Sequence, residues 1–280
     1  MEYPRLSPGG SQLAIATDDG KEANIWIYDL KSHSPIRRLT FNGRNLFPVW
    51  TPDGRYVTFQ SDRDGDRAIF KQPADGNVSA ERLTKPEAGT QHEPESWSRD
   101  GQMLTVNVIR GTQNTFIRQS ADGKLVPLNG PLAVQKHTAF SPDGKWIAYM
   151  SSEQNGLTQV FVQPFPATGA KFQVSDTGRT PVWSADGKEL FYHDPRTNRI
   201  LVVDLRTSPT FSFGKATPLP IEGTIHPATQ RNYDITPDGK QLVVVLPSSG
   251  ARNNSTRRPP QQINVVLNWF RELQERVPVK

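Results

Sequence analysis

The chain has 280 residues, 35% of them hydrophobic and 22% charged, and its formal net charge is +5. It contains no cysteine, which excludes disulfides, thiolate metal sites and a cysteine nucleophile. No apolar run approaches the roughly 18 residues of a membrane span, and the basic residues do not form the aromatic-interleaved stripe of a nucleic-acid module.

A turn motif recurs six times along the chain. The copies are SPGG at 7–10, TPDG at 51–54, SRDG at 98–101, SPDG at 141–144, SADG at 184–187 and TPDG at 236–239. Proline, aspartate and glycine each favour a different position of a tight turn. Successive copies start 43 to 52 residues apart, close to the period of about 40–45 residues of a four-stranded propeller blade.

The residues around each turn predict two strands. A large apolar residue precedes every copy: Leu6, Trp50, Trp97, Phe140, Trp183 and Ile235. Apolar residues then alternate with polar ones after the turn, as at Ile147 and Tyr149. This period of two is typical of a strand with one buried face.

A third strand is expected in every unit, and a fourth in five of them. The third strands are 25–28, 69–72, 116–119, 160–163, 200–203 and 263–267. The fourth are 36–39, 81–84, 125–128, 172–175 and a proline-containing edge near Leu219. The fold predicted is all-β: a single domain over 1–280, a six-bladed β-propeller of four-stranded antiparallel blades. The expected blades are 1–44, 45–90, 91–134, 135–177, 178–228 and 229–270.

The sixth unit is expected to be incomplete. Residues 247–262 have the composition of a flexible loop, and a short amphipathic helix is predicted over 268–277. No fourth strand follows in this unit. We therefore expect that the chain is part of a longer protein whose upstream residues complete the blade.

The repeat resembles that of the TolB-like β-propeller family. The resemblance rests on the five [ST]-x-D-G turns, the preceding aromatic residues, and the prolines at positions 4, 48 and 181 upstream. The first copy has Gly9 in place of the aspartate and is the weakest match. Within the family, 164–192 and the ending VVLNWFREL resemble the C-terminal propellers of bacterial membrane-anchored Ser/Thr kinases and related regulators. This resemblance implies a sensor or interaction module in a periplasmic or extracytoplasmic location.

A polar rim is predicted where the first strand of each blade begins, at one mouth of the central channel. The expected binding residues are Asn45, His92, Glu93, Gln135, Lys136, His137, Arg179, Arg231 and Asn232. His92 and Glu93 are also of the type that ligates divalent metals, but a polar, water-filled channel entrance is the favoured explanation. The segment 61–67, SDRDGDR, lacks the glycine spacing and distal glutamate of a calcium loop and is expected to be a turn.

The sequence therefore predicts a non-enzymatic binding module. No catalytic motif, cofactor or metal site is expected. The expected partner is a protein or peptide on the channel face, with a small ligand as the second possibility; neither nucleic acid nor a membrane segment is expected. The alternative function is a metal-dependent propeller enzyme of the lactonase, lyase or hydrolase type, with its site in the channel.

Overall fold

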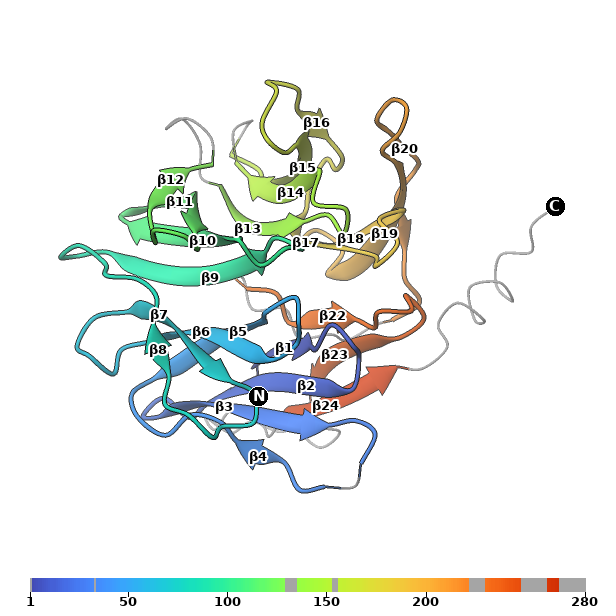
Figure 1. The fold of residues 1–280 in the computed structure, drawn as a ribbon. Helices are drawn as coiled ribbons and strands as arrows, with labels where there is room; N and C mark the ends of the chain where they lie inside the picture. The colour runs from blue at the N-terminus through green and yellow to red at the C-terminus, as the bar shows by residue number, and fades with distance from the viewer. Residues whose placement is uncertain are drawn as a thin grey trace.

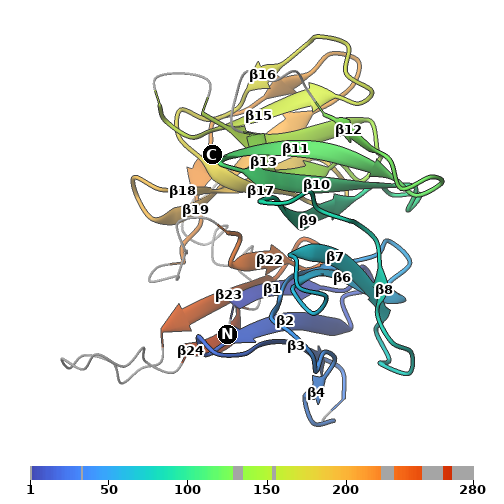
Figure 2. The same cartoon turned by 90° about the vertical axis from the view of Figure 1, so that its left-hand side faces the viewer.

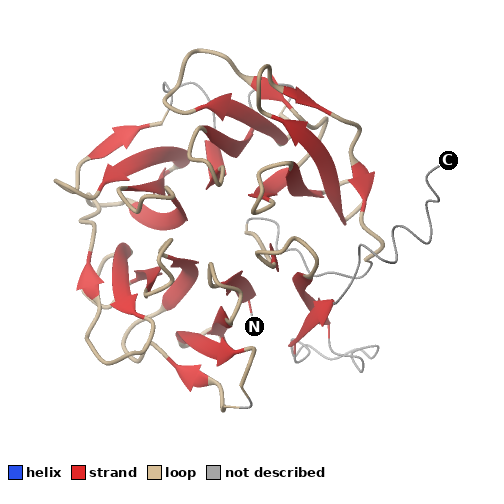
Figure 3. Cartoon of the chain, turned by 45° about the vertical axis from the view of Figure 1, so that its right-hand side comes forward, coloured by secondary structure: helices blue, strands red, loops and turns tan. Residues whose placement is uncertain are grey.

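In the computed structural model the sheets are arranged in a ring around a central axis (Figure 1, Figure 3). We call the first strand of each repeat its inner strand. The structure describes residues 2–32, 34–128, 135–152, 156–221, 230–247 and 261–266. No helix occurs in these ranges. The all-β propeller expected from the repeats is confirmed.

The first three repeats form four-stranded antiparallel sheets. The first comprises β1 (Glu2–Leu6), β2 (Gln12–Asp18), β3 (Ala23–Asp29) and β4 (Arg37–Arg38). The second comprises β5 (Asn45–Trp50), β6 (Tyr56–Ser61), β7 (Ala68–Pro73) and β8 (Glu81–Arg82). The third comprises β9 (Gln91–Trp97), β10 (Met103–Arg110), β11 (Thr112–Gln119) and β12 (Leu125–Pro127). Neighbouring strands within each sheet are consecutive in the chain, as in hairpins.

The remaining repeats continue the ring. The fourth comprises β13 (Gln135–Phe140), β14 (Trp146–Ser151), β15 (Gln159–Pro164) and β16 (Phe172–Gln173). The fifth comprises β17 (Arg179–Trp183), β18 (Glu189–Asp194) and β19 (Arg199–Arg206), with two short edge strands, β20 (Ser212–Phe213) and β21 (Thr217–Pro218), which both pair with β19. The sixth comprises β22 (Tyr233–Ile235), β23 (Leu242–Pro247) and β24 (Gln261–Val266).

The expectation of a six-bladed propeller is wrong, since the structure has five blades in the ranges that it describes. Five sheets have four or more strands, whereas the sixth repeat forms a three-stranded sheet in the part of the chain that is described. The physical reason is that no fourth run of alternating apolar residues follows β24 in the sequence. The helix expected over 268–277 lies outside the described residues, and no helix occurs among the residues that are described. The expected loop 247–262 was too long, since Pro247 ends β23 and Gln261 begins β24.

Burial explains why the sheets assemble into a ring. Each of six apolar clusters lies between two neighbouring sheets, and none is confined to one. Ile25 and Ile27 of β3, for example, share a cluster with Phe59 of β6. Val243 of β23 packs with Leu13 and Ile15 of β2, which closes the ring between the sixth sheet and the first blade (Figure 2). A sheet with two apolar faces is stable only when neighbours cover both.

The repeated turn is held by one side chain in every copy. The Ser or Thr hydroxyl accepts a hydrogen bond from the backbone N–H five residues later, at 2.9 Å from Trp146 to Ser141 in the fourth repeat. In the five copies with Asp it also donates to that carboxylate. The first copy has Gly9 in place of Asp and keeps the first bond alone, from Gln12 N to Ser7 Oγ. The motif is therefore a structural device for the first hairpin of each blade.

We expect Ser141→Ala to lower the free energy of unfolding by about 1–2 kcal/mol, because the Trp146 N–H loses its acceptor and Asp143 loses a donor. Ser141→Thr is the matched control, since Thr51 and Thr236 make the same bonds in other copies. Urea unfolding of both variants measures the effect. Equal stability of the alanine and threonine variants would show that the hydroxyl does not hold the turn.

Candidate functional site

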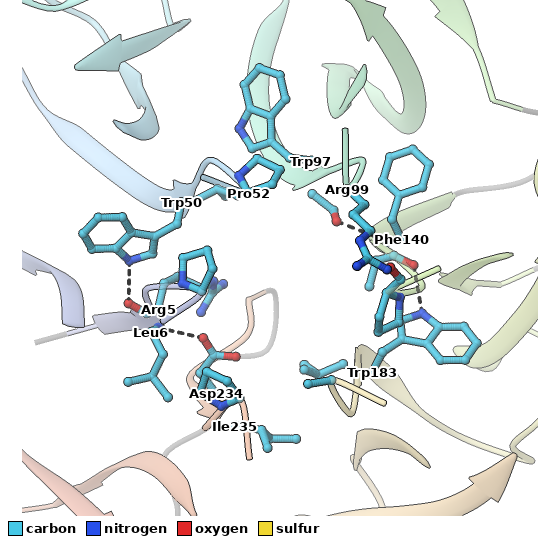
Figure 4. A pocket seen from close by; sticks show the side chains of 18 of the residues that line it. Arg5, Leu6, Trp50, Pro52, Trp97, Arg99, Phe140, Trp183, Asp234 and Ile235 are labelled. Atoms are coloured by element: carbon cyan, nitrogen blue, oxygen red, sulfur yellow. Dashed lines mark hydrogen bonds between the residues drawn. The ribbon is translucent and has the colours of Figure 1, made fainter. Parts of the chain in front are cut away.

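A cavity of about 560 Å³ opens where the six inner strands end and the repeated turns begin. We call it the turn-side cavity. All six repeats contribute lining residues, from the last positions of the inner strand to the residue after the Ser or Thr (Figure 4). An inner strand of six residues spans roughly 20 Å, so this mouth is at the opposite end of the strands from the predicted polar rim.

Large aromatic side chains form part of the wall and are held in place by hydrogen bonds. Trp50 donates its indole N–H to the Arg5 carbonyl at 2.9 Å, and Trp183 donates to the Ala139 carbonyl at 3.0 Å. Trp97 donates to the Thr58 hydroxyl at 3.0 Å. Each of these bonds reaches the preceding blade, so the wall is rigid without any ligand. Rigid aromatic surfaces lose little entropy on binding and are enriched in recognition sites.

A charged cluster interrupts this wall where the sixth sheet meets the first blade. Asp234 accepts the Leu6 backbone N–H through Oδ2 at 2.8 Å, and its Oδ1 lies 3.5 Å from Arg231 Nη2. Arg5 donates from Nη1 to the carbonyls of Pro4, at 2.7 Å, and Arg231, at 3.1 Å. These contacts join β1 to β22 and place two guanidinium groups beside one carboxylate.

A second carboxylate faces the cavity from the third blade. Glu95 accepts hydrogen bonds from the backbone N–H groups of His137 and Thr138 and from the Thr138 and Thr115 hydroxyls. Burial raises the pKa of Glu95 to about 7, although these hydrogen bonds favour the charged form. Glu95 therefore connects the third and fourth blades and can change its charge near neutral pH.

Further titratable groups lie near the start of the inner strands, away from the repeated turns. Burial raises the pKa of Glu93, which accepts hydrogen bonds from Asn107 and Gln230. Burial also lowers the pKa of Lys136, and Glu93 opposes that shift electrostatically. Both shifts follow from desolvation of the charged form.

The structure brings the predicted binding residues together only in part. Of the nine, Arg231 lines the turn-side cavity, whereas the other eight do not. Several hold the framework. Asn45 is buried and binds the carbonyls of Ala23, Asn42 and Gly43 as well as Arg63, while Asn232 accepts the Tyr3 N–H at 2.9 Å.

The remaining members of the predicted set start the inner strands of consecutive repeats. His92 is buried and its carbonyl accepts a hydrogen bond from Gln60. Gln135 pairs with Ser151, and Arg179 pairs with His193, across the first hairpin of their blades. A binding role for this rim stays a prediction.

Backbone geometry distinguishes the inner strands from the others. Four of them contain a non-glycine residue with φ between 54° and 58°: Tyr3, Phe47, His137 and Thr180. Each occupies the fourth position before the Ser or Thr of the turn, where the strand register shifts as in a β-bulge. The bulge redirects the following side chains, among them Arg5 and Thr138, toward the cavity.

Metal ligands do not gather in the ranges that the structure describes: no group of three or more His, Cys, Asp or Glu side chains could hold an ion there. The 61–67 segment is a turn, in which Asp64 and Asp66 pair with Arg82 at 3.1 and 2.5 Å. Two of its three carboxylates are therefore engaged by a cation of the protein, and the third, of Asp62, accepts the Arg44 backbone N–H.

The predicted set of binding residues omitted Arg5 and Asp234, although a signal was present. They occupy the second position before the Ser or Thr of the turn, where the other repeats have Val49, Ser96, Ala139 and Val182. Where the other repeats have a small or apolar residue, a charged residue indicates that the side chain has different neighbours in that repeat. Comparison of the six copies at this position would have identified the pair.

Similarity to known proteins agrees with the fold. Residues 1–123 match the family model described as TolB beta propeller domain. The uncharacterized peptidase YuxL of Bacillus subtilis (strain 168) is 26% identical over 192 residues, which cover 53% of this chain and 29% of that protein. The Tol-Pal system protein TolB of Francisella tularensis subsp. mediasiatica (strain FSC147) is 26% identical over 191 residues, covering 65% of this chain and 43% of that protein. The chain thus spans less than half the length of these relatives.

Solved structures share the architecture. TolB from Acinetobacter baumannii superposes with a TM-score of 0.68 at 18% identity, covering 91% of this chain and 61% of that one. An oligogalacturonate lyase from Vibrio parahaemolyticus gives 0.60 at 12% identity, covering 95% and 89%. These likenesses concern the fold alone. The resemblance to kinase propellers is not shown by any of these comparisons.

Proposed function

From the premise that the chain is a TolB-like β-propeller, we propose that it is a non-enzymatic interaction module which binds a protein or peptide segment in the turn-side cavity. The observation that carries the proposal is the cavity of about 560 Å³ itself, walled by aromatic side chains and entered by charged ones. Cavities of roughly 300–1,000 Å³ accommodate a short segment or small molecule rather than a folded domain. The partner would therefore insert a loop or a chain end.

The relatives support an interaction role without settling it. One set is named for the Tol-Pal system, whereas others are named as a peptidase and a lyase. Glu95 is the residue whose raised pKa is most typical of an acid–base catalyst. Its two oxygens are, however, occupied by donors of the fourth blade, so we assign it to connecting the blades.

The finer part of the proposal concerns context. We propose that the module acts as a sensor or interaction domain of a longer bacterial protein outside the cytoplasm. The resemblance of 164–192 to kinase-attached propellers and the name of the Tol-Pal relatives support this. Among the described residues, no helix is long and apolar enough to cross a membrane. Expression of the longer natural protein, followed by cell fractionation, tests the location.

Binding at this cavity can be tested by blocking it. Ala185 occupies an exposed position of the fifth turn and lines the cavity, so Ala185→Trp places a large side chain at the mouth without disturbing the core. We expect peptides selected from a random linear library on the wild-type protein to bind Ala185→Trp at least about tenfold more weakly, a loss of about 1.4 kcal/mol.

The matched control is Leu157→Trp. Leu157 is 43% exposed and lies in the loop between β14 and β15, which is at the other end of the blade from the turn. Fluorescence anisotropy measures the affinities. Loss of binding in Leu157→Trp with full binding in Ala185→Trp would contradict the proposal and favour the predicted polar rim.

A further inference from the structure

The charges that line the turn-side cavity do not balance. Three guanidinium groups, of Arg5, Arg99 and Arg231, face two carboxylates, of Glu95 and Asp234. Both carboxylates are already used. Asp234 binds the Leu6 N–H and Arg231, and Glu95 binds donors of the fourth blade. The cavity therefore has an excess of positive charge that increases when Glu95 is protonated.

Arg5 is the half-buried cation of the cavity that makes no ion pair, since Arg231 pairs with Asp234 and Arg99 is exposed. No described carboxylate lies within 4.0 Å of the Arg5 guanidinium, and its hydrogen bonds run from Nη1 to two carbonyls. Nε and Nη2 make no bond to a described residue, although a guanidinium has five N–H donors in a planar fork. Figure 4 shows the Arg5 side chain beside Asp234 at the edge of the open space.

The electrostatic environment of Arg5 agrees with this geometry. Burial lowers its pKa, Arg231 lowers it further, and Asp234 opposes the shift. A buried cation without a full counter-charge is costly, and an entering anion offsets that cost. A carboxylate suits the site because it can accept two parallel N–H bonds from one guanidinium edge.

The neighbours of Arg5 indicate what carries the anion. Trp50 packs against the same strand and binds the Arg5 carbonyl, and the proline side chains of the turns, Pro8, Pro52 and Pro237, line the cavity around it. These apolar surfaces suit the methylene groups and neighbouring side chains of a peptide. Arg99 lies across the opening and donates to the Pro142 carbonyl at 3.2 Å.

We propose that the turn-side cavity recognises a carboxylate of the inserted peptide, either an Asp or Glu side chain or a chain end, and that the free edge of Arg5 binds it. This inference rests on the proposed function, since it names the chemistry of the segment that enters. Arg231 stays paired with Asp234, and its positive charge attracts the peptide carboxylate without a direct hydrogen bond. Each peptide carboxylate would gain charge-assisted hydrogen bonds from a partly desolvated donor.

The test uses four random linear peptide libraries on the full chain. One pair contains Asp and Glu, and the other replaces them by Asn and Gln; each pair is made with free and with amidated C-termini. We expect at least about tenfold weaker binding of the peptides without any carboxylate, consistent with the loss of one or two charge-assisted bonds. A preference for free C-termini identifies the chain end as the source, and a preference for the acidic libraries identifies a side chain.

Arg5→Gln provides the second arm. It should weaken binding of the selected carboxylate peptides by about tenfold or more, and it should remove their preference over neutral peptides. Arg5→Lys keeps the positive charge and should retain part of the preference for carboxylate peptides. Arg118→Gln is the matched control, since Arg118 is a half-buried arginine of β11 that binds the Leu83 carbonyl away from the cavity. Thermal unfolding checks that the variants fold.

The outcomes separate this inference from the proposed function. Equal binding of neutral and acidic libraries, still blocked by Ala185→Trp, would overturn the carboxylate site and leave the peptide-binding function standing. Binding of digalacturonate through Arg5, without any peptide binding, would overturn the peptide partner in favour of a sugar acid. Failure of every library would overturn both.

Discussion

Asp234→Ala is expected to lower the free energy of unfolding by about 3 kcal/mol, the largest effect of any single substitution considered. The carboxylate pairs with Arg231, interacts electrostatically with Arg5 and is the acceptor for the Leu6 N–H. Its removal leaves Arg231 without its ion pair, increases the uncompensated charge near Arg5 and leaves one buried N–H without an acceptor. Loss of one partner of a buried ion pair typically costs about 3–5 kcal/mol.

Position 96 offers a matched comparison for this substitution. Ser96 is the equivalent residue of the third repeat, and its Oγ accepts the Phe140 N–H at 3.1 Å. Ser96→Ala removes the same kind of bond without a charge and should cost about 1 kcal/mol. Asp234→Asn keeps a hydrogen-bond acceptor but loses the charge. Its loss in the free energy of unfolding should therefore lie between those of Ser96→Ala and Asp234→Ala. Urea unfolding followed by tryptophan fluorescence gives the values; equal losses for Asp234→Ala and Ser96→Ala would mean that the charge contributes nothing to closing the ring.

Glu95 is expected to make the protein less stable as the pH rises from about 5 to 8. The folded-state pKa of about 7 lies above the ordinary value of 4.5, so within this window the folded state binds more protons than the unfolded state. Stability therefore falls with rising pH, by about 3 kcal/mol over the whole window. Below it the stabilisation is fully present, and above it the charged carboxylate stays buried at a cost.

Glu95→Gln removes the titration and isolates this contribution. The free energy of unfolding of the variant, subtracted from that of the wild type at each pH, should decrease through the window. Glu93 also has a raised pKa and adds to the slope in both proteins, so the difference reports on Glu95. Lys136 lies near both carboxylates; burial lowers its pKa, and both carboxylates oppose that shift. Parallel curves for the two proteins would refute the assignment.

The fold was largely predictable because each repeat carries its own local signals. The turn residues, the preceding aromatic residue and the alternation after it located the first hairpin of every blade. The short fourth strands β8 and β16 fall within the predicted ranges 81–84 and 172–175, and the sixth unit was expected to be incomplete. The count of six blades was wrong because the turn motif marks the first hairpin of a repeat and does not show whether its sheet is complete; in the described part of the chain, five repeats form sheets of four or more strands.

The site was less accessible to sequence reasoning than the fold. Polar residues concentrate at the start of the inner strands, as at Gln135 and Lys136, and for this reason the binding site was predicted there. Many of them serve neighbouring backbone groups, as Asn45 does. The cavity is instead lined by aromatic residues and prolines, and in a sequence these residue types indicate a buried core and turns. Its only unusual feature in the sequence is the pair of charges at Arg5 and Asp234.

A structure of the protein with one of the selected carboxylate peptides tests the proposed binding mode. We expect the peptide to lie in the turn-side cavity, with its carboxylate oxygens within hydrogen-bonding distance of Arg5 Nε and Nη2 and its apolar groups against Trp50 and the prolines of the turns. A peptide bound at the opposite mouth, against His92 and Gln135, would contradict it.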